Sequence, residues 1–88
     1  MEMTLYVSYI APIVEEEELE RLFQRYGEVL EVTIKRYRNG KSKGWGYVTM
    51  AQVRDARKAI AELDGKQWRG RSISVSKALP GGVTRYPW

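Results

Sequence analysis

Apolar and polar residues alternate with a period of two in four separate stretches of the chain. Such alternation is typical of β-strands, in which successive side chains point to opposite faces. The second stretch shows it clearly, because Leu30, Val32 and Ile34 alternate with polar residues. We expect these three side chains on one face of a sheet. The four predicted strands cover residues 5–9, 29–37, 43–50 and 71–77.

Two other stretches repeat apolar residues every three or four positions, which predicts amphipathic helices over residues 15–26 and about 53–63. The first turn of the first helix is rich in glutamate, where the helix dipole favours negative charge. Glu15 stands at the capping position, so we expect a weaker helix start than serine or threonine would give. The inward stripes are Leu19, Leu22, Phe23 and Tyr26 in the first helix and Ala56, Ala59, Ile60 and Leu63 in the second.

The order strand, helix, strand, strand, helix, strand predicts an α+β fold. It is the order of the ferredoxin-like β-α-β-β-α-β sandwich, a four-stranded antiparallel sheet with two helices on one face. Asn39 and Gly40 mark the hairpin between the middle strands. Both helices must cover the apolar face, and an antiparallel sheet can leave its other face open to solvent. Tyr6, Trp45 and Tyr47 fall on this open face, where grouped aromatic side chains indicate a binding surface.

The phase of the alternation also assigns residues to the covered face. Tyr9 has the phase of Leu5 and Val7 and is expected with them. Gly44 and Gly46 have the phase of the apolar residues in the third strand. Since they lack side chains, we expect a helix to pack closely against them.

Composition narrows the function. The 88 residues form one domain and include no cysteine and no histidine. This excludes disulfides and thiolate metal sites and removes the commonest zinc ligand and the usual general base. We therefore expect no cofactor, no metal and no enzymatic activity. The longest apolar runs are far shorter than the ~20 residues that span a bilayer, and no signal peptide is evident, so we expect an intracellular protein without membrane association.

Charge is distributed unevenly along the chain. Residues 1–34 carry a net charge of −6, whereas residues 35–88 carry +10. Such asymmetry suggests a polyanionic partner for the basic part, although a basic surface can also serve solubility alone.

Two short segments resemble the signatures of the RNA recognition motif family. The segment KGWGYVTM, residues 43–50, matches the longer signature in seven of eight positions, with Met50 in place of an aromatic residue. The segment LYVSYI, residues 5–10, matches the shorter signature except at Tyr9, where the family usually has asparagine. The resemblance implies a single-stranded RNA-binding domain over residues 1–79, with bases stacked on Tyr6, Trp45 and Tyr47. Single-stranded DNA is a further possible ligand.

The remaining candidate contacts surround these three aromatic residues. In the family, the position of Lys43 contacts phosphate and the position of Lys77 often contacts RNA. The basic hairpin over residues 35–43 is expected to contact phosphates, unless it is only a solvated loop. Thr33 and Ser76 alternate with the apolar residues of their strands, so we expect both on the open face. The predicted RNA-binding set is Tyr6, Thr33, Lys35, Arg36, Arg38, Lys41, Lys43, Trp45, Tyr47, Ser76 and Lys77.

Two other hypotheses about the function stay open. A protein-binding variant of this fold uses its helical face and a basic-x-aromatic tripeptide, which Lys66, Gln67 and Trp68 faintly resemble; Trp68 is otherwise expected to pack on the core. An enzyme of this fold, such as an acyl phosphatase, would need a nucleophile paired with a base, and none is evident. We expect a monomer, with protein partners possible.

The last residues, 80–88, show no periodicity and are expected to form a flexible tail. Tyr86 and Trp88 there leave two alternatives to a free tail. The tail could shield the aromatic residues and compete with RNA, or it could extend the stacking surface by one base.

Overall fold

The computed structural model describes residues 1–78. The expected domain end at residue 79 and the expectations for residues 80–88, including Tyr86 and Trp88, lie outside the described residues and stay predictions. The elements are β1 (Met3–Ser8), α1 (Glu16–Gln24), β2 (Val29–Arg36), β3 (Ser42–Met50), α2 (Val53–Leu63), β4 (Gln67–Trp68), β5 (Arg71–Ser72) and β6 (Ser74–Lys77).

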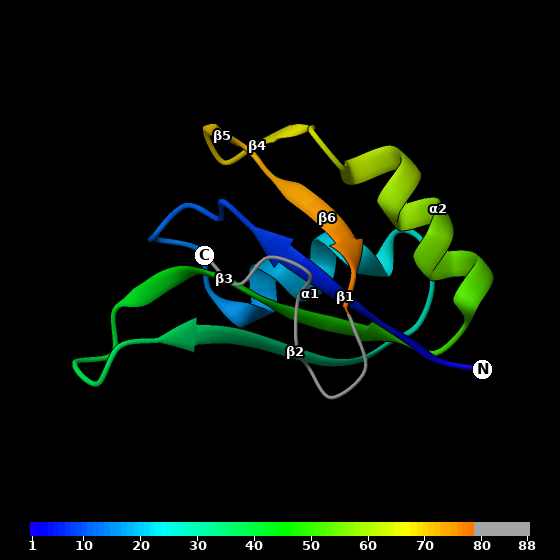
Figure 1. The fold of residues 1–88 in the computed structure, drawn as a ribbon, viewed down its shortest axis with the longest axis horizontal. Helices are drawn as coiled ribbons and strands as arrows, with labels where there is room; N and C mark the ends of the chain where they lie inside the picture. The colour runs from blue at the N-terminus through cyan, green and yellow to red at the C-terminus, as the bar shows by residue number, and fades with distance from the viewer. Residues whose placement is uncertain (79–88) are drawn as a thin grey trace.

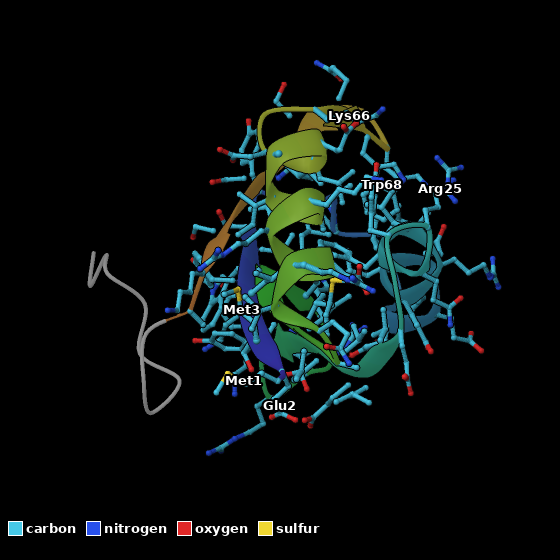
Figure 2. All side chains as sticks on the ribbon, turned by 90° about the vertical axis from the view of Figure 1, so that its right-hand side faces the viewer. Met1, Glu2, Met3, Arg25, Lys66 and Trp68 are labelled. Carbon is cyan, nitrogen blue, oxygen red and sulfur yellow. The ribbon has the colours of Figure 1, made fainter. Side chains whose placement is uncertain are left out.

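The main sheet has the strand order β2-β3-β1-β6, and all neighbouring strands are antiparallel. Both helices lie on one side of this sheet (Figures 1 and 2). The β2–β3 hairpin projects beyond the rest of the fold, at the left of Figure 1. This arrangement confirms the predicted ferredoxin-like α+β sandwich.

The core lies between the sheet and the two helices. The predicted stripes supply the helix side of it, since Leu19, Leu22 and Phe23 of α1 and Leu63 of α2 are buried. Tyr26 and Ile60 are partly buried and pack against the core. The core residues are Leu5, Val7, Ile10, Ala11, Val14, Leu19, Leu22, Phe23, Ile34, Val48, Met50, Ala56, Ala59, Leu63, Ile73 and Val75.

Strand β2 departs from strict alternation near its start. Its register with β3 shifts between Val29 and Glu31, which marks a β-bulge. The bulge turns Leu30 outward, where 51% of it is exposed, and Val29 packs against the core instead. The expectation of an inward Leu30 is therefore wrong, because Leu30 is the extra residue of the bulge and the predicted alternation holds only from Glu31 onward.

The predicted last strand is divided into two. Arg71 and Ser72 form β5, which pairs with β4 in a separate two-stranded sheet, and only β6 joins the main sheet beside β1. Trp68 of β4 is partly buried and packs against the core, as expected. The short β4–β5 hairpin thus connects α2 to β6, the edge strand of the main sheet.

A side-chain hydrogen bond that the sequence did not predict stabilises the start of α1. The Glu18 side chain accepts a hydrogen bond from the backbone N–H of Glu15, at 3.1 Å. This is half of a capping box and satisfies a backbone donor that the helix leaves unpaired. The glutamates of the first turn therefore hold the helix start as well as facing its dipole.

Candidate nucleic-acid interface

Three aromatic rings meet on the sheet face opposite the helices. We call Tyr6, Trp45 and Tyr47 the aromatic platform. Tyr6 of β1 pairs directly with Tyr47 of β3, and Ser8 pairs with Trp45. The ring centroids lie 5.9 Å apart for Tyr6 and Trp45, 5.8 Å for Tyr6 and Tyr47, and 6.0 Å for Trp45 and Tyr47. All three side chains are partly exposed. The expected convergence is thus confirmed, and it follows from alternation within β3 and direct pairing with β1.

The platform rings are tilted rather than stacked on one another. The planes of Tyr6 and Trp45 meet at 52°, and those of Trp45 and Tyr47 at 86°. Tilted and edge-to-face contacts are favourable between aromatic rings. They hold each ring in place, and all three side chains stay partly exposed to solvent, which suits the stacking of flat ligands.

Tyr6 keeps its proton at neutral pH. Burial raises the pKa of its hydroxyl above the ordinary value of 10.0, while a hydrogen bond with the Ser8 side chain acts in the opposite direction. The platform therefore presents an uncharged Tyr6 ring, and an anionic ligand meets no repulsion from it.

Two glycines shape β3 at the platform. Gly44 has a φ of +85° and lies where the β2–β3 register shifts, and its carbonyl accepts a hydrogen bond from the N–H of Ile10, at 2.8 Å. At Gly46 a Cβ atom would meet the carbonyl oxygen of Thr33 and would lie 2.9 Å from the Cα of Ile34. The close approach comes from the backbone of β2 at Gly46 and from the carbonyl oxygen of Ile10 at Gly44, so the expectation of a helix packed against these glycines is wrong.

Polar side chains border the platform on both sides. Thr33 of β2 pairs with Tyr47, and Ser76 of β6 pairs with Tyr6, so both have the expected open-face phase. Lys77 differs, because it pairs with the buried Leu5 and therefore has the phase of the helix-covered face. Its exposed side chain leaves the sheet on that side, at the end of β6.

The hairpin that follows β2 places exposed cations beside the platform. The Tyr37 N–H donates to the Lys41 carbonyl, at 2.8 Å, and Gly40 takes a φ of +90° in the turn, as the Asn39-Gly40 pair predicts. Exposed in this hairpin are Lys35, Arg38, Lys41 and Lys43. The Lys43 ammonium lies 5.4 Å from the centroid of the Tyr37 ring, a cation–π contact that tethers it near the base of the hairpin.

Arg36 behaves differently from the other hairpin cations. Its guanidinium contacts the carboxylates of Glu15, at 3.1 Å, and Glu16, at 2.9 Å, at the start of α1. Glu16 also accepts a hydrogen bond from the N–H of Ile34, at 3.4 Å. Arg36 was expected to contact phosphate, but here it joins β2 to the helix layer and its charge is already matched.

The ion pair of Arg36 predicts a dependence of stability on pH. The hydrogen bond from Arg36 lowers the pKa of Glu16 below its ordinary value of 4.5. The pair therefore stabilises the fold at pH above 4.5, and this contribution is lost as pH falls through the lowered value. Glu16→Gln should cost about 0.5 kcal/mol at neutral pH, since both side chains of the pair are still partly exposed to solvent, and should flatten the loss of stability in acid.

Urea unfolding of the variant and parent between neutral pH and about pH 3 measures this effect. Glu17→Gln is the matched control, because it removes a charge from the same helix turn. It should retain the acid dependence of the parent. An equal change in both variants would mean that the helix dipole, and not Arg36, is responsible.

A further aromatic residue at this end of the sheet was missed by the sequence reading. Tyr9 was expected to face the core, but it has a φ of 60° and is 59% exposed. The guanidinium of Arg71 lies 4.8 Å from the centroid of its ring. The mismatch at the asparagine position of the signature was the available signal, because asparagine tolerates this left-handed conformation better than tyrosine does.

Within residues 1–78, no group of three or more carboxylate, histidine or cysteine side chains is placed to hold a metal ion. Across the same residues, no helix is long and apolar enough to cross a membrane. The open face presents aromatic side chains and hydroxyl groups beside a basic hairpin.

An open-faced sandwich with aromatic side chains on its two central strands defines a class of small binding domains. The chain belongs to the RNA recognition motif family, whose sequence model matches residues 5–74. This match confirms the resemblance drawn from the segments on β1 and β3.

Two characterised relatives come from a fungus and a plant. The chain is 38% identical over 74 residues to "Polyadenylate-binding protein, cytoplasmic and nuclear" of Chaetomium globosum. The alignment covers 84% of this chain and 10% of the relative. It is 36% identical over 77 residues to "Glycine-rich RNA-binding protein RZ1C" of Arabidopsis thaliana, covering 86% of this chain and 25% of the relative. The chain thus spans a quarter or less of the length of these relatives.

Solved structures share the whole architecture. The crystal structure of RNA binding protein PG1 is 40% identical with a TM-score of 0.86, and the alignment covers 88% of this chain and 94% of that one. A structure described as the Sxl-lethal protein/RNA complex is 31% identical with a TM-score of 0.85, covering 93% of this chain and 50% of that one.

Proposed function

We propose that this domain binds single-stranded RNA on its open sheet face. The observation that carries the proposal is the aromatic platform, in which three rings from two paired strands lie within 6.0 Å of one another. Every nucleobase has a π face, and stacking on an aromatic side chain contributes roughly 1–3 kcal/mol per base. Neighbouring residues of one face are about 7 Å apart along a strand, so successive splayed bases can occupy Trp45 and Tyr47.

Several further facts support RNA as the ligand. The family is one of RNA-binding modules, both relatives are named for binding RNA or polyadenylate, and one structural neighbour is an RNA complex. These facts point to a binding domain rather than an enzyme. We propose an intracellular location, because the fungal relative is named as cytoplasmic and nuclear.

Within this proposal the residues have distinct roles. Tyr6, Trp45 and Tyr47 stack bases. The hydroxyl groups of Thr33 and Ser76, on either side of the platform, are placed to hydrogen bond with base edges or riboses. The exposed cations Lys35, Arg38, Lys41 and Lys43 contact phosphates. Arg36 is assigned to the fold because its charge is matched by α1, and Lys77 is assigned a peripheral contact at most.

Single-stranded DNA offers the same bases and phosphates and should also bind. The hydroxyls that border the platform can read the ribose 2′-OH, which distinguishes RNA from DNA. Both points can be tested with matched RNA and DNA oligonucleotides. Their affinities for the parent show whether RNA is preferred, and a variant without the two β3 rings shows whether binding depends on the platform.

The hairpin cations are expected to act through phosphate. Changing Arg38 and Lys41 to alanine should lower affinity about equally for all sequences. Each phosphate contact on a single strand contributes about −0.7 to the slope of log affinity against log salt, so the variant's slope should be shallower by about 1.4. Fluorescence anisotropy of labelled RNA over a salt series measures both quantities.

Arg57→Ala with Lys58→Ala is the matched control, since it removes two exposed cations from α2. It should leave the salt slope close to that of the parent. A hairpin variant that altered base preference and kept the parent slope would contradict the phosphate role.

A further inference from the structure

A groove lies on the helix side of the molecule, between α1 and the β4–β5 hairpin. Its volume is about 420 Å³, within the range of ligand-binding clefts. It belongs to the face that the platform does not use, because α1 covers the other side of the sheet (Figure 2). Lining it are Glu18, Arg21, Leu22, Arg25, Trp68 and Arg69.

The groove has an apolar floor. Leu22 is 6% exposed, and Trp68 is partly buried and packs against the core. Figure 2 shows Trp68 and Arg25 close together at one end of the molecule. The lining residues 18, 21, 22 and 25 follow the helical spacing of i, i+3, i+4 and i+7, so they form one face of α1 and of the cap that ends it. A single large apolar side chain could therefore rest on this floor while remaining in contact with the rim.

The rim is strongly basic. Glu18 is already paired with Arg69, whose guanidinium lies 2.6 Å from its carboxylate. Among residues 1–78, neither Arg21 nor Arg25 lies within 4.0 Å of a carboxylate. They stand one helical turn apart and leave two unmatched positive charges beside the apolar floor. The complementary ligand is anionic and carries an apolar group.

The conformation of Arg69 adds a second observation. Arg69 and Gly70 form the two-residue turn between β4 and β5, with φ values of 53° and 83°. Such a turn favours asparagine and glycine, and a long side chain at its first position is unfavourable. Arg69 nevertheless occupies it, with its guanidinium 5.8 Å from the centroid of the Trp68 ring. The strained turn holds a cation and an aromatic ring at the groove, as functional sites often do.

The groove suits a peptide better than a nucleic acid. Base recognition on a single strand needs aromatic faces that are free to stack, whereas Trp68 packs on the core and lies beneath Arg69. Guanidinium groups bind carboxylates through paired hydrogen bonds. We propose that this groove binds an acidic peptide segment of a partner protein, which places one large apolar side chain on Leu22 and Trp68 and carboxylates against Arg21 and Arg25.

NMR titration of the ¹⁵N-labelled chain with the synthetic peptide GSDEFEDLGS tests this proposal. The expected result is a set of shift changes at the amides of Leu22 and Arg25 and at the Trp68 indole, with the platform amides unchanged. Arg21→Gln with Arg25→Gln should weaken binding by about tenfold or more, since it removes both charge-assisted contacts. RNA affinity, measured on the same variant, should stay within about twofold of the parent because the open face is intact.

Matched probes and variants make the test specific. Arg57→Gln with Lys58→Gln removes the same charge from α2 and should bind the peptide like the parent. The uncharged peptide GSNQFQNLGS and the peptide GSDESEDSGS, which lacks large apolar residues, should both bind at least several-fold more weakly. Equal binding of either peptide, or equal weakening in the α2 variant, would overturn the proposal. Shifts at the groove on adding oligouridylate but none with the acidic peptide would replace it with a second RNA-binding surface.

Discussion

Replacing Trp45 and Tyr47 together with alanine is expected to weaken the binding of single-stranded RNA by about 2–6 kcal/mol. The estimate is that of two lost base stacks at roughly 1–3 kcal/mol each. Both side chains lie on the open face and neither belongs to the buried core. The variant should therefore stay folded, and its loss of affinity should exceed that of any change in the hairpin. Anisotropy titration with one labelled oligonucleotide measures the affinity, and thermal unfolding verifies the fold.

The conservative pair Trp45→Phe with Tyr47→Phe is the matched control. It keeps two ring faces and removes the indole N–H and the tyrosine hydroxyl. If stacking is responsible, the phenylalanine pair should keep most of the binding free energy that the alanine pair loses. If the phenylalanine pair is as weak as the alanine pair, hydrogen bonding by these side chains is the main contribution. Parent-like affinity of the alanine pair would refute RNA binding on the platform.

Alternation in the sequence was sufficient to predict the platform. Trp45 and Tyr47 are two residues apart in a strand, so their shared face needs no knowledge of the rest of the chain. The position of Tyr6 beside them needed one further inference, the pairing of β1 with β3. That inference came from the order of the elements, because in this fold the first and third strands lie side by side.

Details that depend on contacts between strands could not be predicted in the same way. Bulges at Leu30 and Gly44 arise where two strands must match registers, and neither strand alone specifies them. Arg71 and Ser72 of β5 were likewise assigned to one last strand with β6, because they continue the same alternation. In each of these places the pattern along the chain is compatible with two pairings.

The ion-pair partners of long charged side chains could not be predicted from the sequence either. The acidic turn at the start of α1 was read mainly as a solvated helix start that suits the dipole. In the structure Glu15 and Glu16 pair with Arg36 at the end of β2, and Glu18 pairs with Arg69 in the β4–β5 turn. The acidic helix start thus anchors two hairpins to one helix. These ion pairs neutralise part of the charge asymmetry of the chain within the fold. The exposed cations of the β2–β3 hairpin stay available to bind a polyanion.

Gly46 is the position where the platform and the stability of the sheet depend on the same atoms. It lies between the two platform residues of β3 and has Ile34 as its partner in β2. A Cβ atom there would overlap the backbone carbonyl of Thr33, which cannot rotate away as a flexible side chain could. The strands would have to separate locally, and the pairing of Thr33 with Tyr47 would be disturbed.

Gly46→Ala is therefore expected to lower the free energy of unfolding by about 3 kcal/mol, the upper part of the usual range for overpacking. Gly40→Ala in the hairpin turn is the control. Nothing lies within 4 Å of a Cβ built there, and its φ of +90° predicts a cost of only about 1–2 kcal/mol from backbone strain. Urea unfolding separates the two effects. RNA affinity, measured where both variants are folded, should fall for Gly46→Ala through the displaced Tyr47 ring and stay near the parent for Gly40→Ala. A Gly46→Ala protein as stable as the parent would mean that β2 and β3 can part at this point without cost, and the close approach of their backbones could then not be the reason for glycine here.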